Sequence, residues 1–286
     1  MDPILEGMVD LHIHAGPSIA ARSCDAFDMM KMAEEAKYKA YVVKDHYFPT
    51  TFSCTLANRH VGNGSVQAYG GICLNNSVGL FNLNAVDAAY QMGAKFVCMP
   101  TVSSRQHLMS HKGKVFGGSA ANMYPETPVY YLDDNGELLP EVKDLCAYLA
   151  GKPDLILYTG HGCAGEVDAL IQEAVKAGVK RILVNHPFHI VKASIEQITR
   201  WSQMGCYIEM CGGLFRKPEP EVNLEMILQN VSIDRLILDT DSGQKGGSLP
   251  VDRLLNSIRI LREEHGVTDD QLNIMMKKNP SALLGI

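Results

Sequence analysis

The chain has 286 residues, 46% hydrophobic and 20% charged, with a formal net charge of −6. This composition is that of an ordinary globular protein and excludes a disordered or fibrous chain. No Lys/Arg run is long enough to track a phosphate backbone, and no apolar stretch approaches the ~20 residues of a membrane span. We therefore expect a small-molecule partner, with neither nucleic acid nor a membrane. The N-terminus lacks a basic region followed by an apolar segment, so we expect a cytoplasmic protein.

Short apolar runs alternate with amphipathic stretches along the whole chain, a pattern typical of βα units around a parallel sheet. The runs predict eight strands, at residues 8–14, 40–46, 66–73, 95–101, 155–161, 181–186, 206–210 and 235–241. Helices are predicted between them, at residues 25–39, 166–177, 195–204, 221–230 and 254–264. The fold class that fits is α/β, a (β/α)8 TIM barrel forming one domain over residues 1–286. A seven-stranded version of this barrel is the alternative.

One connection, residues 101–154, is much longer than the others. It contains a Gly-rich stretch and a predicted hairpin at residues 129–139 that turns at Asp134-Asn135-Gly136. Because it follows strand four at the end of the barrel where active sites lie, we expect this insertion to cover the site. The hairpin is also a candidate interface, and the sequence leaves a monomer and a homo-oligomer both open.

Polar residues gather where the predicted strands end. Strand one ends with His12 and His14, strand five with His161, strand six with His186 and strand eight with Asp241. Side chains alternate along a strand, so His12 and His14 face the same way. Imidazoles with a carboxylate suit one or two Zn²⁺ ions, and Mn²⁺, Fe²⁺ or Ni²⁺ are alternatives. The sequence therefore predicts a metal site at one rim of the barrel.

The ordered set resembles the amidohydrolase superfamily, which has His-x-His at strand one, His at strands five and six and Asp at strand eight. The C-terminal stretch Asn279-Pro280-Ser281-Ala282-Leu283-Leu284-Gly285-Ile286 is similar to the ending common in that superfamily. The Asp-Thr-Asp-Ser-Gly ending of strand eight looks like the phosphotriesterase and lactonase branch. The resemblance implies a metal-dependent hydrolase that acts on an amide, cyclic amide or lactone of a small organic acid.

Strand two departs from the superfamily pattern and leaves two roles open. The lysine or glutamate that commonly bridges two metals at strand four is missing, so either one metal binds or Lys44 supplies a metal-bound carbamate. The other reading of Lys44 is an electrostatic group for substrate. The pair Asp45-His46 resembles the Asp-His of PHP-type phosphoesterases, which share the His-x-His. We place His46 first as a substrate-facing group and second as a ligand.

In the mechanism that the resemblance implies, Asp241 binds metal and acts as the general base toward water. Substrate contacts are predicted from His46, Arg105, His107 and Arg216, because an arginine above the metal could clamp a carboxylate. Two other functions remain open, a PHP-type phosphoesterase and a non-catalytic ligand-binding barrel.

Overall fold

The computed structural model describes residues 2–111, 124–215 and 220–286. Its strands form two hydrogen-bonded groups in which every neighbouring pair is parallel. The first group contains β1 (Val9–Ile13), β2 (Ala40–Val43) and β3 (Gln67–Tyr69). The second contains β4 (Gly71–Cys73), β5 (Phe96–Cys98), β6 (Ile156–Tyr158), β7 (Ile182–Val184), β8 (Tyr207–Met210) and β9 (Leu236–Leu238).

The two groups join into one eight-stranded barrel. The third predicted strand is divided at Gly70, so that β3 pairs with β2 while β4 pairs with β5. A Cβ on Gly70 would lie 2.5 Å from the backbone nitrogen of Thr51, so only glycine fits at this position. At the other junction, Ile13 and Ser242 form a parallel bridge, and the His14 amide donates to the Ser242 carbonyl at 2.7 Å. The predicted (β/α)8 barrel is confirmed.

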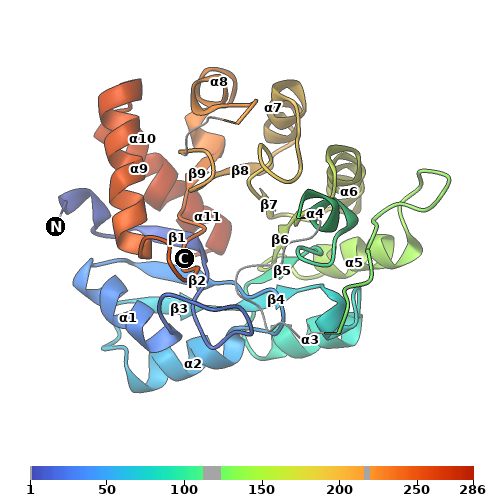
Figure 1. The fold of residues 1–286 in the computed structure, drawn as a ribbon, viewed down its shortest axis with the longest axis horizontal. Coiled ribbons are helices and arrows are strands. Elements are labelled where there is room, and N and C mark those ends of the chain that lie inside the picture. Colours follow the sequence, from blue (N-terminus) through green and yellow to red (C-terminus); the bar gives the residue numbers. More distant parts are fainter. Residues whose placement is uncertain (1, 112–123, 216–219) are drawn as a thin grey trace.

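Helices surround the strands (Figure 1). Their bounds are α1 (Ala26–Glu35), α2 (Thr51–His60), α3 (Leu83–Gln91), α4 (Arg105–Ser110), α5 (Pro140–Ala150), α6 (Ala164–Ala177), α7 (Ile195–Gln203), α8 (Leu224–Asn230), α9 (Pro250–His265), α10 (Asp269–Asn273) and α11 (Asn279–Leu284). Helix α1 begins with an Asp25 capping box and ends four residues before the predicted end, since Lys37 has a φ of 55°. Helix α6 ends at Ala177, as predicted, and Gly178 caps it with a φ of 94°. No described helix has the length and apolar character needed to cross a membrane.

Two apolar layers hold the barrel. A large layer packs between strands and helices, and a smaller one fills the barrel interior with side chains such as Leu11, Val42 and Phe96. Leu283 and Leu284 of α11 belong to this interior layer, and α11 contacts β1 and β9. Apolar side chains therefore pack this part of the interior, and the predicted ligands His161, His186 and Asp241 follow the carboxyl ends of β6, β7 and β9.

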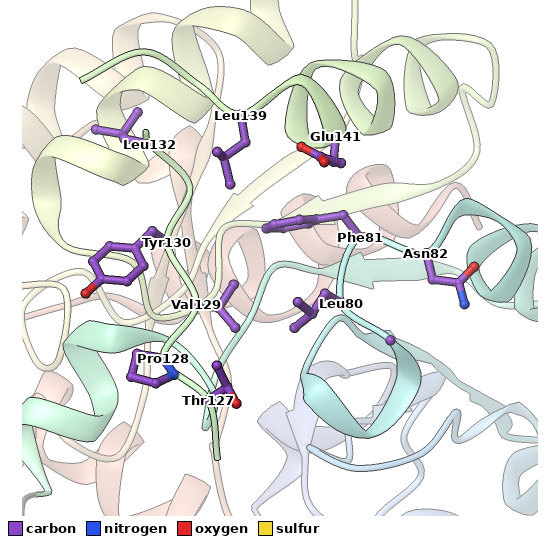
Figure 2. Close-up of a pocket in the computed structure, with 11 residues that line it drawn as sticks. Leu80, Phe81, Asn82, Thr127, Pro128, Val129, Tyr130, Leu132, Leu139 and Glu141 are labelled. Carbon is purple, nitrogen blue, oxygen red and sulfur yellow. The ribbon is translucent and has the colours of Figure 1, made fainter. Parts of the chain in front are cut away.

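The insertion after β5 is described at residues 101–111 and 124–154. Leu132 and Leu138 form an antiparallel bridge around a turn at Asp133–Gly136, so the predicted small hairpin is present. Between this segment and the loop at residues 79–82 lies an apolar pocket of 640 Å³ (Figure 2). Its lining includes Phe81 and Tyr130 and none of the predicted metal ligands.

Candidate metal centre

The end of β1 brings two imidazoles and one carboxylate to a single point. The Nε2 atoms of His12 and His14 lie 3.2 Å apart. Oδ1 of Asp241 lies 3.4 Å from the first and 3.2 Å from the second. The two histidine side chains are 1% exposed, whereas that of Asp241 is 29% exposed. Asp241 is thus the member of this trio that solvent can reach.

The second ring nitrogen of each histidine, Nδ1, lies within hydrogen-bond distance of an acceptor on the side away from Asp241. Nδ1 of His12 lies 2.7 Å from Oε1 of Glu209, and Nδ1 of His14 lies 2.8 Å from the carbonyl oxygen of Lys44. With Nδ1 of each ring held by those acceptors, Nε2 is the nitrogen that adjoins Asp241, and Nε2 of His12 also lies 3.3 Å from Nζ of Lys44. Such a contact on the far nitrogen commonly fixes the ring of a metal-binding histidine.

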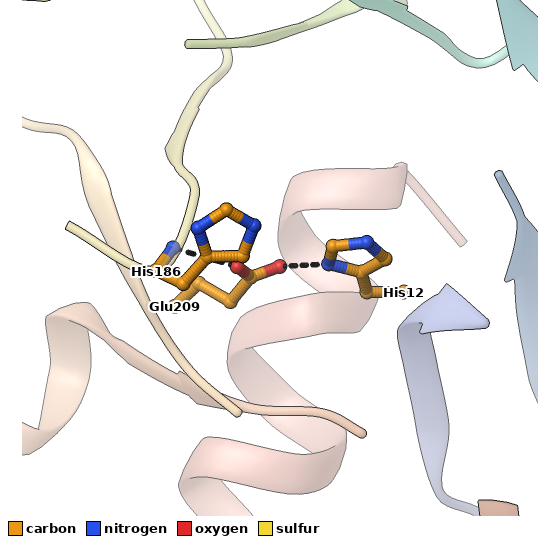
Figure 3. Close-up of side chains that lie close together, drawn as sticks. All are labelled: His12, His186 and Glu209. Atoms are coloured by element: carbon orange, nitrogen blue, oxygen red, sulfur yellow. Dashed lines mark hydrogen bonds and ion pairs between the residues drawn. The ribbon is translucent and has the colours of Figure 1, made fainter. Parts of the chain in front are cut away.

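Glu209 on β8 is a residue that sequence reasoning missed. Its carboxylate lies between His12 and His186 (Figure 3), and Oε2 accepts a hydrogen bond of 2.7 Å from the His186 amide. Asn185 donates to Oε1 at 3.3 Å. The side chain is fully buried. The signal was available, because a glutamate within a strand predicted to be buried requires partners.

His161 and His186 complete the cluster from β6 and β7. Their ring centroids are 4.9 Å apart, and His186 lies 5.8 Å from His12. Nε2 of His161 and Nδ1 of His186 are buried and lack a hydrogen-bond partner within the part of the chain that the structure describes. Buried polar atoms are nearly always satisfied, so a cation at this cluster would account for both. The donor set of nitrogens and carboxylate oxygens therefore fits a divalent metal.

Groups of these residues lie close enough to hold a metal ion. One group is His12, His14 and Asp241, and another is His12, His186 and Glu209. The backbone is strained where two of the predicted ligands stand, with φ of 22° at His186 and 44° at Asp241. Residues other than glycine in this region cost free energy, and they concentrate at functional sites.

Two further histidines line the same cluster. His107 on α4 stacks on His161, with centroids 5.1 Å apart and Nδ1 atoms 2.9 Å apart. His46 lies 4.9 Å from the His14 ring, and its Nδ1 is 2.9 Å from Oγ1 of Thr101. His107 thus lies behind a predicted ligand, whereas His46 adjoins the His12–His14 pair. Their substrate contacts stay predictions.

Lys44 is fully buried, and its Nζ lies 3.3 Å from Nε2 of His12. Burial lowers the pKa of this ammonium, but Cys98, Cys73, Glu209 and Asp241 outweigh burial and raise it above the ordinary value. The lysine is therefore charged beside the cluster, and its carbamate form stays a prediction.

Burial keeps His14 and His186 neutral. It lowers the pKa of His14 to about 3 and that of His186 to about 4. Burial raises the pKa of Asp241, but the His12 and His14 rings lower it by more. The net pKa of this carboxyl lies far below the ordinary value. Neutral imidazoles and an ionised carboxylate are the states in which these groups bind metals. Burial and the adjoining Glu209 raise the pKa of Asp239, so that this deeper carboxyl is neutral.

A protein family described as a family of unknown function, DUF6282, matches residues 7–209. The chain belongs to this family. No curated protein matches the sequence.

Solved structures share the architecture over nearly the whole chain. A candidate 2-pyrone-4,6-dicarboxylic acid hydrolase from Pseudomonas putida is 11% identical, with a TM-score of 0.57 over 98% of this chain and 97% of that one. A TatD homologue from Escherichia coli K12 is 16% identical, with a TM-score of 0.58 over 98% of both chains. Organophosphorus hydrolase from Deinococcus radiodurans is 14% identical, with a TM-score of 0.56 over 98% of this chain and 92% of that one. At such identities the likeness shows a common fold.

Of the two predicted substrate arginines, the structure describes only Arg105. Arg105 is exposed at the start of α4, and its guanidinium lies 5.6 Å from the centre of the Tyr130 ring. Arg216 falls outside the described residues. An arginine that sequence reasoning did not select, Arg22, pairs with Asp45 at 3.0 Å, and its charge contributes to the low pKa of the His14 ring.

Proposed function

We propose that this protein is a metal-dependent hydrolase that uses activated water to cleave an amide, cyclic amide or lactone bond of a small organic acid. The observation that carries the proposal is the meeting of Nε2 of His12, Nε2 of His14 and Oδ1 of Asp241 within 3.4 Å of one another. The partners behind both rings leave those nitrogens free to bind a cation.

His12, His14 and Asp241 would hold one divalent ion, with Zn²⁺ as the first choice and Mn²⁺, Fe²⁺ or Ni²⁺ as alternatives. His161 and His186 would hold a second ion, with Lys44 as its carbamate, or would complete the shell of a single one. A bound divalent cation lowers the pKa of water toward neutrality and polarises a carbonyl group.

Asp241 suits the role of general base because its carboxylate adjoins Nε2 of both His12 and His14 and is the most exposed side chain of this trio. In the proposed reaction, the oxygen of a water molecule forms a bond to the substrate carbonyl carbon as Asp241 takes the water's proton. The carbon–nitrogen or carbon–oxygen bond then breaks, and Asp241 delivers the proton to the leaving atom. His186 or His46 would stabilise the oxyanion.

The solved structures with the same architecture support this proposal. Their names include a hydrolase of a 2-pyrone dicarboxylic acid and an organophosphorus hydrolase. The shared barrel places strand ends at the active-site face in the usual way, but barrels host many chemistries, so the residues of this site have to carry the assignment.

The test combines metal content with an activity screen. Metal per chain is measured by plasma mass spectrometry, and turnover is screened over lactones, cyclic amides, N-acyl amino acids and phosphomonoesters. We expect at least one metal ion per chain and turnover of a carbon–oxygen or carbon–nitrogen bond. The variant Asp241→Asn should lose about 100- to 10,000-fold in kcat, the usual worth of a general base. Asp144→Asn, at an exposed position on α5, is the matched control.

Three outcomes would contradict the proposal in different ways. Near-native activity of Asp241→Asn would remove Asp241 from the base role. Turnover confined to phosphomonoesters would favour a PHP-type phosphoesterase. No metal after reconstitution, together with no turnover, would favour a non-catalytic ligand-binding barrel.

A further inference from the structure

A buried arginine beside the metal cluster has donors that nothing in the described chain satisfies. The side chain of Arg22 is 3% exposed, and Nη2 donates to Oδ1 of Asp45 at 3.0 Å. Nε and Nη1 of the same guanidinium are buried and have no hydrogen-bond partner among the described residues. Unpaired N–H groups of a buried cation are costly, so they indicate a missing acceptor.

Asp45 cannot be that acceptor, because its own oxygens are already occupied. Oδ1 accepts from the Ser18 hydroxyl as well as from Arg22, and Oδ2 accepts from the amides of Tyr47 and Phe48 at 3.0 and 3.3 Å. Asp45 therefore anchors one nitrogen of the guanidinium and leaves the remaining donors for another group. A purely structural ion pair would be expected to satisfy more of the cation.

The loop that carries Arg22 is fastened to the rim of the metal cluster. Arg22 forms an antiparallel bridge with Gln244, and the Ser23 amide donates to the Gly243 carbonyl at 2.8 Å. Gly243 stands two residues after Asp241. The partner of the Arg22 side chain, Asp45, lies between Lys44 and His46 in the sequence. Arg22 is thus fixed against the strand ends that supply the cluster.

We propose that Arg22 binds a carboxylate of the substrate, so that the bond cleaved belongs to an amide or lactone that itself carries a carboxylate. This inference rests on the proposed hydrolase function for its meaning, but the binding it describes does not require turnover. A planar guanidinium matches a carboxylate well. Asp45 already neutralises the arginine, so the pair as a whole is neutral and suits a singly charged carboxylate better than a doubly charged phosphate.

The test measures binding of a matched pair of probes, 2-furoate and 2-furamide, by isothermal titration calorimetry of the protein as purified. The probes differ in charge at one group, and Arg22→Gln removes the proposed partner of that charge. We expect Arg22→Gln to lower the affinity for 2-furoate by about 10- to 100-fold, the usual contribution of a charged hydrogen bond. The affinity for 2-furamide should change by less than about twofold. Arg22→Lys keeps a positive charge opposite Asp45, so the variant should stay folded. It should still lower the affinity for 2-furoate.

The control is Arg259→Lys, at an arginine on α9 whose side chain is 49% exposed and pairs with Glu263. Thermal melting of each variant checks that the chain is folded. Equal binding of the two probes by the unaltered protein, or an equal loss of both in Arg22→Lys, would overturn the inference. Binding that depends on Arg22 in a protein without turnover would sustain this inference while the hydrolase proposal fails. Turnover without Arg22-dependent binding of 2-furoate would sustain the hydrolase proposal and overturn this inference.

Discussion

Replacing Glu209 by glutamine removes one negative charge from behind His12 while keeping the size of the side chain. In the native site, the two carboxylate oxygens each accept a hydrogen bond of 2.7 Å, from Nδ1 of His12 and from the His186 amide. Glutamine has one carbonyl oxygen, so its amide group must face one of these two donors. The substitution therefore loses at least one hydrogen bond and leaves a buried donor unpaired.

The expected magnitude follows from this count. An unsatisfied buried donor costs about 1–3 kcal/mol. Removing the negative charge also makes the His12 ring a weaker base toward a cation at Nε2. Loss of a group that orients a metal-binding histidine commonly lowers metal affinity 10- to 100-fold. We expect Glu209→Gln to weaken Zn²⁺ binding by about that factor, equivalent to about 1.4–2.8 kcal/mol.

The assay is competition for Zn²⁺ between the protein and a chelating dye of known affinity. Glu225→Gln on α8 is the matched control, because Glu225 is exposed and its carboxylate contacts Gln229 on the same helix. Circular dichroism verifies that both variants are folded. A folded Glu209→Gln protein with native Zn²⁺ affinity would refute the view that Glu209 holds His12 in place.

Two other predictions concern stability. A Cβ on Gly243 would lie 1.8 Å from the His14 carbonyl oxygen, so Gly243→Ala should cost about 3 kcal/mol or more in the free energy of unfolding, measured with urea. Gly246→Ala, which also has a positive φ but open space around it, should cost only about 1 kcal/mol, and equal losses would contradict the clash. In the metal-free protein, His14 and His186 stay neutral down to about pH 3 and 4, whereas the unfolded chain binds these protons below about 6.5. The free energy of unfolding should therefore fall as the pH drops from about 6.5 to 4, by on the order of 1 kcal/mol per unit for each histidine. His46, His107 and His161, whose pKa values burial also lowers, add to this fall. Asp10 and Asp239, whose pKa values burial raises, act in the opposite sense and offset about two histidines, so a flat profile would contradict the burial of neutral rings.

The architecture could be read from the sequence because it depends on local patterns. Apolar runs and the glycine at position 178 mark elements that the structure contains. The division of the third strand at Gly70 was not predictable, because it depends on the backbone of residues 50–51 passing close by. Those residues are distant in sequence, and no local pattern reports the approach.

The site was predictable to the extent that it depends on strand ends. His12, His14 and Asp241 come together because parallel strands of a barrel end at one rim. Glu209 and Arg22 were missed for different reasons. Glu209 lies inside a strand rather than at its end, and Arg22 lies on a loop whose position is set by pairing with Gln244. Such tertiary pairing is invisible to strand periodicity.

The charges within the cluster connect the number of metal ions to the state of Lys44. Glu209 and Asp241 are ionised and Lys44 is protonated, so these groups carry one net negative charge. One divalent ion changes this to one net positive charge. A second ion would bring the total to three net positive charges, which is costly in buried surroundings. If the Lys44 ammonium loses a proton to solvent and the free amine takes up carbon dioxide with loss of a second proton, the carbamate replaces the positive charge with a negative one and restores the balance for two ions. Binding of a second metal should therefore depend on carbon dioxide, and added bicarbonate should raise the metal content of the native protein but not of Lys44→Arg.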